Sequence, residues 1–108
     1  MDVFENENGI YHESRINDII RNRRMAYIRQ FPNVVSKLAL LVTSGMIMDR
    51  AWKETAGSQE GELYREMRLT AEELDNLVEP ETAYARFIDR CSTKETTKLA
   101  SAILQNLS

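Results

Sequence analysis

The chain has 108 residues, of which 43% are hydrophobic and 29% are charged; this length and composition suit one compact domain and exclude a disordered chain. Its 14 Lys and Arg against 17 Asp and Glu leave a formal charge of −3, which excludes a uniformly basic nucleic-acid binder. Cys91 is the only cysteine, so an internal disulfide is excluded, and the sequence shows neither a signal-peptide pattern nor the run of about 20 apolar residues that a membrane span needs.

The N-terminal residues predict a disordered arm followed by a helix. Residues 1–12 are acidic, rich in Asn and without an apolar period, so we expect a disordered arm or linker there. Strong helix formers follow over residues 13–30, and two adjacent arginines interrupt their apolar face. The residues of that face are Ile16, Ile20, Tyr27 and Phe31, and the arginines are Arg23 and Arg24. This helix is expected to stop before Pro32, because proline lacks the backbone N–H group.

Residues 32–44 predict a second helix that is apolar around most of its circumference. Its apolar residues are Val34, Val35, Leu38, Ala39, Leu40, Leu41 and Val42. Such a helix usually lies in the centre of a domain. Gly45 is expected to end it in the left-handed conformation, with Met46 folded back onto Leu41 in a Schellman motif.

Two further helices are expected in the middle of the chain. A short helix over residues 47–56 carries Trp52 on its buried side. A regular apolar period then predicts one long helix that extends to Val78. A capping-box pattern at Thr70 offers the alternative of a new helix there, but the apolar phase continues through Thr70, so we favour a single helix.

The C-terminal third predicts two more helices. Pro80 suits the first turn of a helix, and the capping-box pattern of residues 92–95 opens the last one. The inward residues of the first of these helices are Ala83, Tyr84, Phe87, Ile88 and Cys91. Since no segment alternates with the period of a strand, we predict an all-α fold, an antiparallel bundle of about six helices, with residues 13–108 forming its single domain.

Candidates for chemistry are few. His12 is the only histidine and has no assignable partner, and Cys91 lies on an apolar stripe, where a buried and unreactive thiol is favoured. Glu62 and Glu66 have the i, i+4 spacing of metal ligands, but di-metal bundles also use Glu-x-x-His motifs, which the chain lacks. Trp52 is interpreted as core. We therefore expect no enzyme, no cofactor and no metal site.

Charge is unevenly distributed along the chain. Residues 15–29 hold five arginines against Asp18, whereas residues 60–81 hold eight acids against two arginines. The two segments could neutralise each other, or the arginines could bind nucleic-acid phosphates or lie against an anionic membrane surface. The candidate membrane-proximal or partner-binding residues are Arg21, Arg23, Arg24, Arg29, Glu66 and Glu73. For the two glutamates, plain solvation is the favoured interpretation.

Residues 31–52 read FPNVVSKLALLVTSGMIMDRAW. This segment resembles the opening of the type II secretion system F family, most closely of its members from tight-adherence (Flp-type) pilus systems. The family opens with a proline, an apolar helix ending in Ala-Gly or Ser-Gly, a turn, and a helix with a buried alanine. Residues 81–91 (ETAYARFIDRC) and 98–107 (KLASAILQNL) resemble its second half. The family often has a glycine turn before that half, where this chain has residues 77–80 (LVEP).

The resemblance implies a six-helix bundle at the cytoplasmic face of the bacterial inner membrane, attached through membrane segments outside this chain. Family members are scaffolds without catalysis, so the implied partners are the secretion or pilus-assembly ATPase, other platform proteins and a second copy of the chain, not nucleic acid. Positive charge is favoured on cytoplasmic flanks of membrane segments, which would explain the arginine-rich helix. The alternative is a small helical nucleic-acid-binding or regulatory protein that uses Arg21, Arg23 and Arg24.

Overall fold

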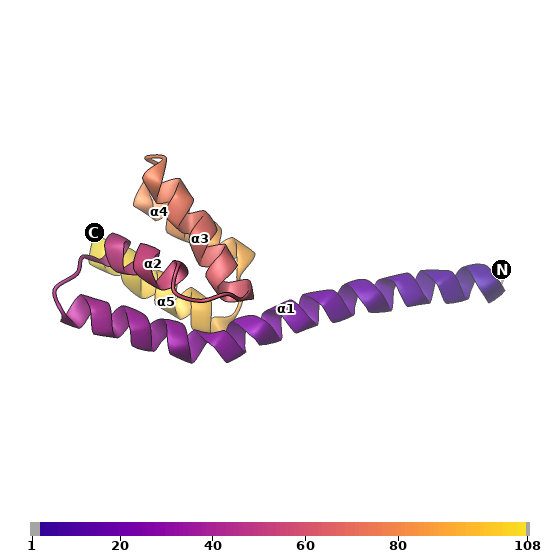
Figure 1. Ribbon diagram of the computed structural model, residues 1–108. Coiled ribbons are helices and arrows are strands. Elements are labelled where there is room, and N and C mark those ends of the chain that lie inside the picture. The colour runs from indigo at the N-terminus through magenta and orange to yellow at the C-terminus, as the bar shows by residue number, and fades with distance from the viewer. Residues whose placement is uncertain (1–2, 108) are drawn as a thin grey trace.

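The computed structural model describes residues 3–107, with side chains from residue 14 to residue 105, and within that part it is all-α, as the sequence predicts. Figure 1 shows its five helices, α1 (Val3–Thr43), α2 (Met48–Ala56), α3 (Glu62–Asp75), α4 (Pro80–Arg90) and α5 (Lys94–Leu107). Between residues 3 and 107, none of the helices combines the length and the apolarity that a bilayer span requires.

The first helix, α1, runs through Pro32, so the predicted stop before this proline is wrong, and residues 3–107 form five helices rather than about six. A proline inside a helix removes one backbone hydrogen bond, at a cost of about 3 kcal/mol. Tyr27 and Val34, on either side of it, are buried in the same core, so tertiary packing holds the helix together across the proline. Figure 1 shows α1 changing direction where it reaches the other helices, and a bend is a common effect of a helix proline.

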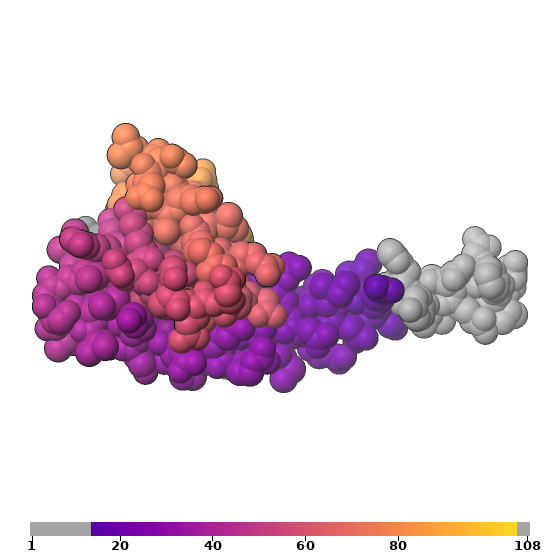
Figure 2. Space-filling view, viewed as in Figure 1, coloured from indigo at the N-terminus to yellow at the C-terminus, as the bar shows by residue number. Residues whose placement is uncertain are grey.

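The N-terminal half of α1 projects from the other helices (Figure 1), and in Figure 2 the segment that begins at residue 14 stands clear of the globular part. The molecule therefore measures 63 × 25 × 21 Å. The expected disordered arm over residues 1–12 is helical from Val3 onward, while Met1 and Asp2 lie outside the described residues. Once nucleated, a helix gains one hydrogen bond per added residue, so it can extend into a polar segment beyond the core.

The C-terminal half of α1 packs against α2, α3 and α5. Val34 and Leu38 are buried in this contact, whereas Leu40 and Val42 are exposed. The expectation of a central helix is therefore wrong, because α1 lies at the outside of the bundle and buries only one face. The apolar residues of its outer face are not covered by the part of the chain that the structure describes.

The turn after α1 confirms the predicted Schellman motif. Gly45 has a φ of 106°, and its N–H group donates a hydrogen bond to the carbonyl of Val42 at 3.0 Å. The N–H group of Met46 reaches back to the carbonyl of Leu41, also at 3.0 Å. Glycine suits this position because a side chain at such a φ would be strained. The turn sends the chain back toward the core, where α2 begins.

The long helix predicted to extend to Val78 is α3, which continues through Thr70 as expected but ends earlier, at Asp75. Leu77 has a φ of 63° and Val78 donates to the carbonyl of Glu73 at 2.9 Å, so a second Schellman motif closes this helix. The apolar period predicted too long a helix because Leu77 points into solvent instead of continuing the buried stripe.

The last helix, α5, is capped one residue later than the sequence pattern predicts. The cap is Thr93, whose hydroxyl accepts a hydrogen bond from the N–H group of Thr96 at 3.1 Å, while the Thr93 N–H group donates to the Thr96 hydroxyl at 3.3 Å. Ser92 instead donates to the carbonyl of Asp89, at the end of α4. Thr96 thus takes the role expected of Glu95, because a hydroxyl suits this buried turn and a carboxylate would have to be desolvated.

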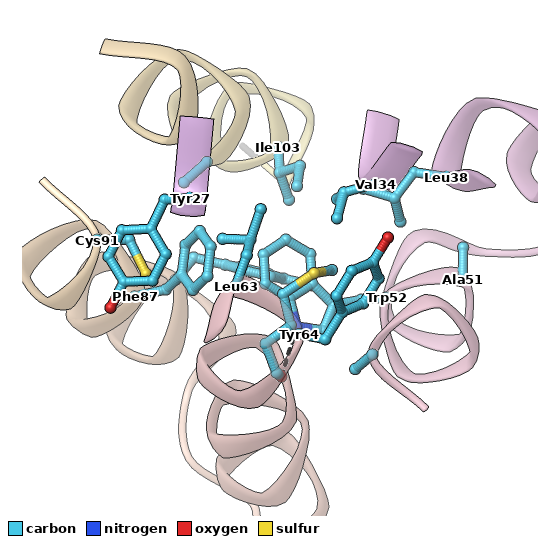
Figure 3. Close-up of a cluster of buried hydrophobic side chains, with 14 residues drawn as sticks. Tyr27, Val34, Leu38, Ala51, Trp52, Leu63, Tyr64, Phe87, Cys91 and Ile103 are labelled. Atoms are coloured by element: carbon cyan, nitrogen blue, oxygen red, sulfur yellow. Dashed lines mark hydrogen bonds between the residues drawn. The ribbon is translucent and has the colours of Figure 1, made fainter. Parts of the chain in front are cut away.

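The core forms around Trp52 of α2, which is fully buried, as the sequence predicts (Figure 3). The rings of Tyr84 and Phe87 from α4 pack against its ring in T-shaped arrangements, with centroid distances of 5.0 and 4.9 Å. Its indole N–H group donates to the carbonyl of Met67 in α3 at 3.0 Å. One side chain therefore fixes the relative positions of α2, α3 and α4.

Candidate functional site

Glu66 and Glu73, the two acidic candidates of the sequence, face α4 rather than solvent. Arg90 donates from Nε to the Glu66 carboxylate at 2.7 Å, and from Nη2 to the Glu66 carbonyl and the Thr70 hydroxyl at 3.0 and 2.9 Å. Arg86 forms an ion pair with Glu73. The favoured interpretation of plain solvation is therefore wrong for both glutamates, because basic residues of the neighbouring helix lie opposite them.

This α3–α4 network also shows where the acidic segment finds its countercharges. Glu66 and Glu73 are paired with arginines of α4, not with the arginine-rich segment of α1. The hypothesis that the acidic and basic segments neutralise each other directly is thus not realised by these two residues. Positive charge on α1 remains to be accounted for.

The four arginine candidates on α1 have different surroundings. Arg21 forms an i, i+3 ion pair with Asp18 at 2.6 Å on the exposed surface. A hydrogen bond from Gln30 is the main cause that lowers the pKa of the Glu62 carboxyl, and the charge of the nearby Arg29 contributes to the same effect. Arg23 and Arg24 are exposed and have no ion pair among the side chains of residues 14–105.

Arg23 and Arg24 line a pocket together with Arg90. The pocket has a volume of about 180 Å³ and lies between α1 and the turn that joins α4 to α5. Its polar lining consists of Arg23, Arg24 and Tyr27 of α1, Arg90 of α4, and Ser92 and Thr93 of the turn. We name this site the arginine pocket. Three guanidinium groups supply it with positive charge and hydrogen-bond donors.

Sequence reasoning found two of the three arginines in this pocket but missed Arg90. Nothing in the local pattern marks it, since Arg90 is separated from Arg23 and Arg24 by more than 60 residues and reaches them only through the packing of α4 and α5 against α1.

Behind the pocket, Tyr27 and Cys91 lie together in the core (Figure 3). Burial, with a smaller contribution from the charge of Glu66, raises the pKa of the Cys91 thiol to about 12. Burial likewise raises the pKa of Tyr27 to about 12. A thiol that stays protonated is neither a nucleophile nor a metal ligand at neutral pH, which confirms Cys91 as a core residue.

The remaining candidates for chemistry are not brought together. Among the described residues, no group of three or more His, Cys, Asp and Glu side chains lies close enough to hold a metal ion. The side chain of His12 lies outside the described side chains. Of the candidate residues, Arg23 and Arg24 gather with Arg90 at one place, and guanidinium groups typically bind anions.

Comparison with protein-family models, with curated proteins and with solved structures finds no match to this chain. The resemblance to the type II secretion system F family therefore rests on the sequence patterns given above.

Proposed function

We propose that the chain is a non-catalytic cytoplasmic scaffold domain of an inner-membrane platform protein in type II secretion or in type IV or Flp pilus assembly. Its partners would be the assembly ATPase, other platform subunits and a second copy of the chain. The supporting observation is the local structure of residues 31–52, where the residues that carry the resemblance have defined structural roles.

Gly45 and Ala51 are the two most telling positions of that segment. Gly45 ends α1 in a left-handed conformation, and Ala51 is fully buried in α2, next to Trp52. A family pattern of a Ser-Gly helix end, a turn and a helix with a buried alanine describes this geometry. Of the two later segments that resemble the family, residues 81–91 overlap α4 and residues 98–107 lie within α5.

The exposed surface offers room for partners. Leu40 and Ile47 are exposed near the turn between α1 and α2, and Ile19 is exposed on the projecting half of α1. Large apolar side chains at the surface are frequent at protein–protein contacts. A scaffold that binds several partners at once needs separate faces of this kind.

Site-specific photo-crosslinking in cells of the source organism tests this proposal. A benzophenone amino acid would replace Ile19, Leu40 or Leu77, which lie on three different parts of the surface, and Phe87, which is buried, would serve as the control. We expect at least one surface position to yield a crosslink to the assembly ATPase or a platform protein. If none of the three captures such a protein while each variant accumulates normally, the scaffold proposal is wrong.

A second candidate function is nucleic-acid binding, and it is favoured by the unpaired state of Arg23 and Arg24 among the described side chains. Filter binding of DNA and RNA at low salt distinguishes it from the scaffold function. Binding through phosphate contacts should weaken steeply as salt increases, since counterions are released. No retention of nucleic acid at low salt would dismiss this alternative.

A further inference from the structure

We propose that the arginine pocket binds a phosphate group, carried either by a free phosphate compound or by a phospholipid headgroup. The proposal goes beyond the scaffold function and does not depend on it. It rests on the convergence of three arginines from α1 and α4 with the N-terminal end of α5.

The first step is the net charge of the pocket. Glu66 balances the charge of Arg90, because its carboxylate accepts a hydrogen bond from the Arg90 guanidinium at 2.7 Å. Arg23 and Arg24 have no such partner among the side chains of residues 14–105. The pocket therefore carries an excess of positive charge, and like charges brought together are stabilised by an anion between them.

The second step is the geometry of Arg90. Its guanidinium group is held by the Glu66 carboxylate, the Glu66 carbonyl and the Thr70 hydroxyl, all within 3.0 Å. A fixed guanidinium loses little rotational freedom when it binds a ligand. Arg90 is thus a preorganised wall of the pocket, whereas Arg23 and Arg24 are exposed and can close over an anion from outside.

The third step is the end of α5. Thr93 caps this helix by accepting from the N–H group of Thr96, and the N–H groups of Lys94 and Glu95 belong to the first turn, where a helix offers no internal acceptor. The positive end of the helix dipole lies in the same place. Two neighbouring hollows share Ser92 and Thr93 with the pocket and add Lys94 to the basic rim.

These donors approach from several directions, which suits a phosphate better than a planar carboxylate. A phosphate has three or four oxygens arranged around one centre, and arginine forms bidentate contacts with it. Ile20 lines the pocket and Ile28 lines the adjoining hollow, and both are exposed. An apolar border beside a basic pocket is the arrangement that a phospholipid, with its acyl chains, would use.

The test uses the 108-residue chain and two probes. Inorganic phosphate is titrated in a buffer of low ionic strength while the amide NMR signals of Thr93, Lys94 and Glu95 are followed. Co-sedimentation is measured with vesicles of phosphatidylglycerol in phosphatidylcholine, and with phosphatidylcholine alone. The pocket variant is Arg23→Gln with Arg24→Gln. The control variant is Arg15→Gln with Arg21→Gln, which removes the same charge from the same helix but outside the pocket.

We expect the pocket variant to weaken binding at least about tenfold and the control variant to weaken it no more than about threefold. Binding of inorganic phosphate with no preference for phosphatidylglycerol assigns the pocket to a free phosphate compound, and vesicle binding alone assigns it to a headgroup. Equal losses in both variants would mean unspecific attraction and would overturn the proposal, as would the absence of binding to both probes. Since neither variant alters a buried residue, thermal unfolding should be unchanged in both.

Discussion

Gln30, in the middle of α1, caps α3: its side-chain carbonyl accepts a hydrogen bond from the N–H group of Leu63 at 2.8 Å. Its amide nitrogen also donates to the carboxylate of Glu62 at 2.8 Å. Gly61, which precedes α3, has no side chain to serve as a cap, and a Cβ atom there would lie 2.8 Å from the Gln30 oxygen. A residue 33 positions away in the sequence thus does the work of a local cap.

Replacing Gln30 with Ala should lower the free energy of unfolding by about 1–2 kcal/mol, because the first turn of α3 then loses its acceptor. Urea unfolding followed by circular dichroism measures the loss. Gln59→Ala is the matched control, since Gln59 is exposed, and it should change stability by less than about 0.5 kcal/mol. Equal effects of the two substitutions would show that the Gln30 cap does not stabilise the fold.

The same substitution should alter the response to acid. The hydrogen bond from Gln30 is the largest cause that holds the pKa of Glu62 below its usual value. A lowered pKa means that the folded state releases this proton more readily than the unfolded state, so its stabilisation is present above the ordinary glutamate pKa of about 4.3 and is lost as pH falls below it. Unfolding curves at pH 6 and below should therefore show a smaller acid-induced loss in Gln30→Ala than in the parent chain.

How far the sequence predicts the fold depends on how local each signal is. Gly45, Pro80 and the apolar residues around Trp52 and Phe87 act within a few positions, and the structure confirms each of them. Whether α1 stops at Pro32 does not depend on the neighbouring residues alone. It was decided by burial of residues on both sides of the proline in one core, which no window of sequence contains.

The same distinction applies to the candidate site. Arg23 and Arg24 could be named from the uneven charge, but their meeting with Arg90 depends on how α4 and α5 pack against α1. Glu66 was expected to face solvent because its helical phase is polar, and it instead pairs with an arginine of α4. Charge pairing between helices requires the tertiary arrangement, so sequence reasoning named the residues but not their partners.

Replacing Tyr84 with Phe should lower the stability of the protein. Its ring is fully buried, and its hydroxyl donates a hydrogen bond to the carboxylate of Asp49 at 2.7 Å, which joins α4 to α2. A hydrogen bond to a charged group contributes about 1.5–3 kcal/mol, so Tyr84→Phe should lower the free energy of unfolding by an amount near the lower end of this range. Tyr64→Phe is the control, because no partner is bonded to the Tyr64 hydroxyl within the described residues. A loss of the same size in both variants would contradict the role of Asp49.

Cys91 should make the protein less stable at alkaline pH. Burial raises the pKa of its thiol to about 12, so above pH 9 the folded state keeps a proton that the unfolded state has released. Stability contributed by this group is present below the unfolded pKa and is lost as pH rises toward 12. Between pH 8 and pH 10 we expect a loss of about 1 kcal/mol in urea unfolding, before the tyrosines contribute fully. Cys91→Ala should flatten this dependence even if it lowers stability at pH 8, and an unchanged slope would exclude the thiol as its source.

Leu77 occupies a backbone conformation that glycine adopts more easily. Its φ is 63°, and 91% of its surface is exposed, so its side chain gains little from packing. A left-handed conformation costs a non-glycine residue about 1–2 kcal/mol, and part of this is offset because glycine makes the unfolded chain more flexible. Leu77→Gly should therefore raise the free energy of unfolding by about 0.5–1 kcal/mol, measured by urea unfolding. Leu69→Gly provides the contrast, because Leu69 lies within α3, where glycine should destabilise by about 1 kcal/mol. Destabilisation by Leu77→Gly as well would mean that Leu77 makes contacts that its exposure does not suggest.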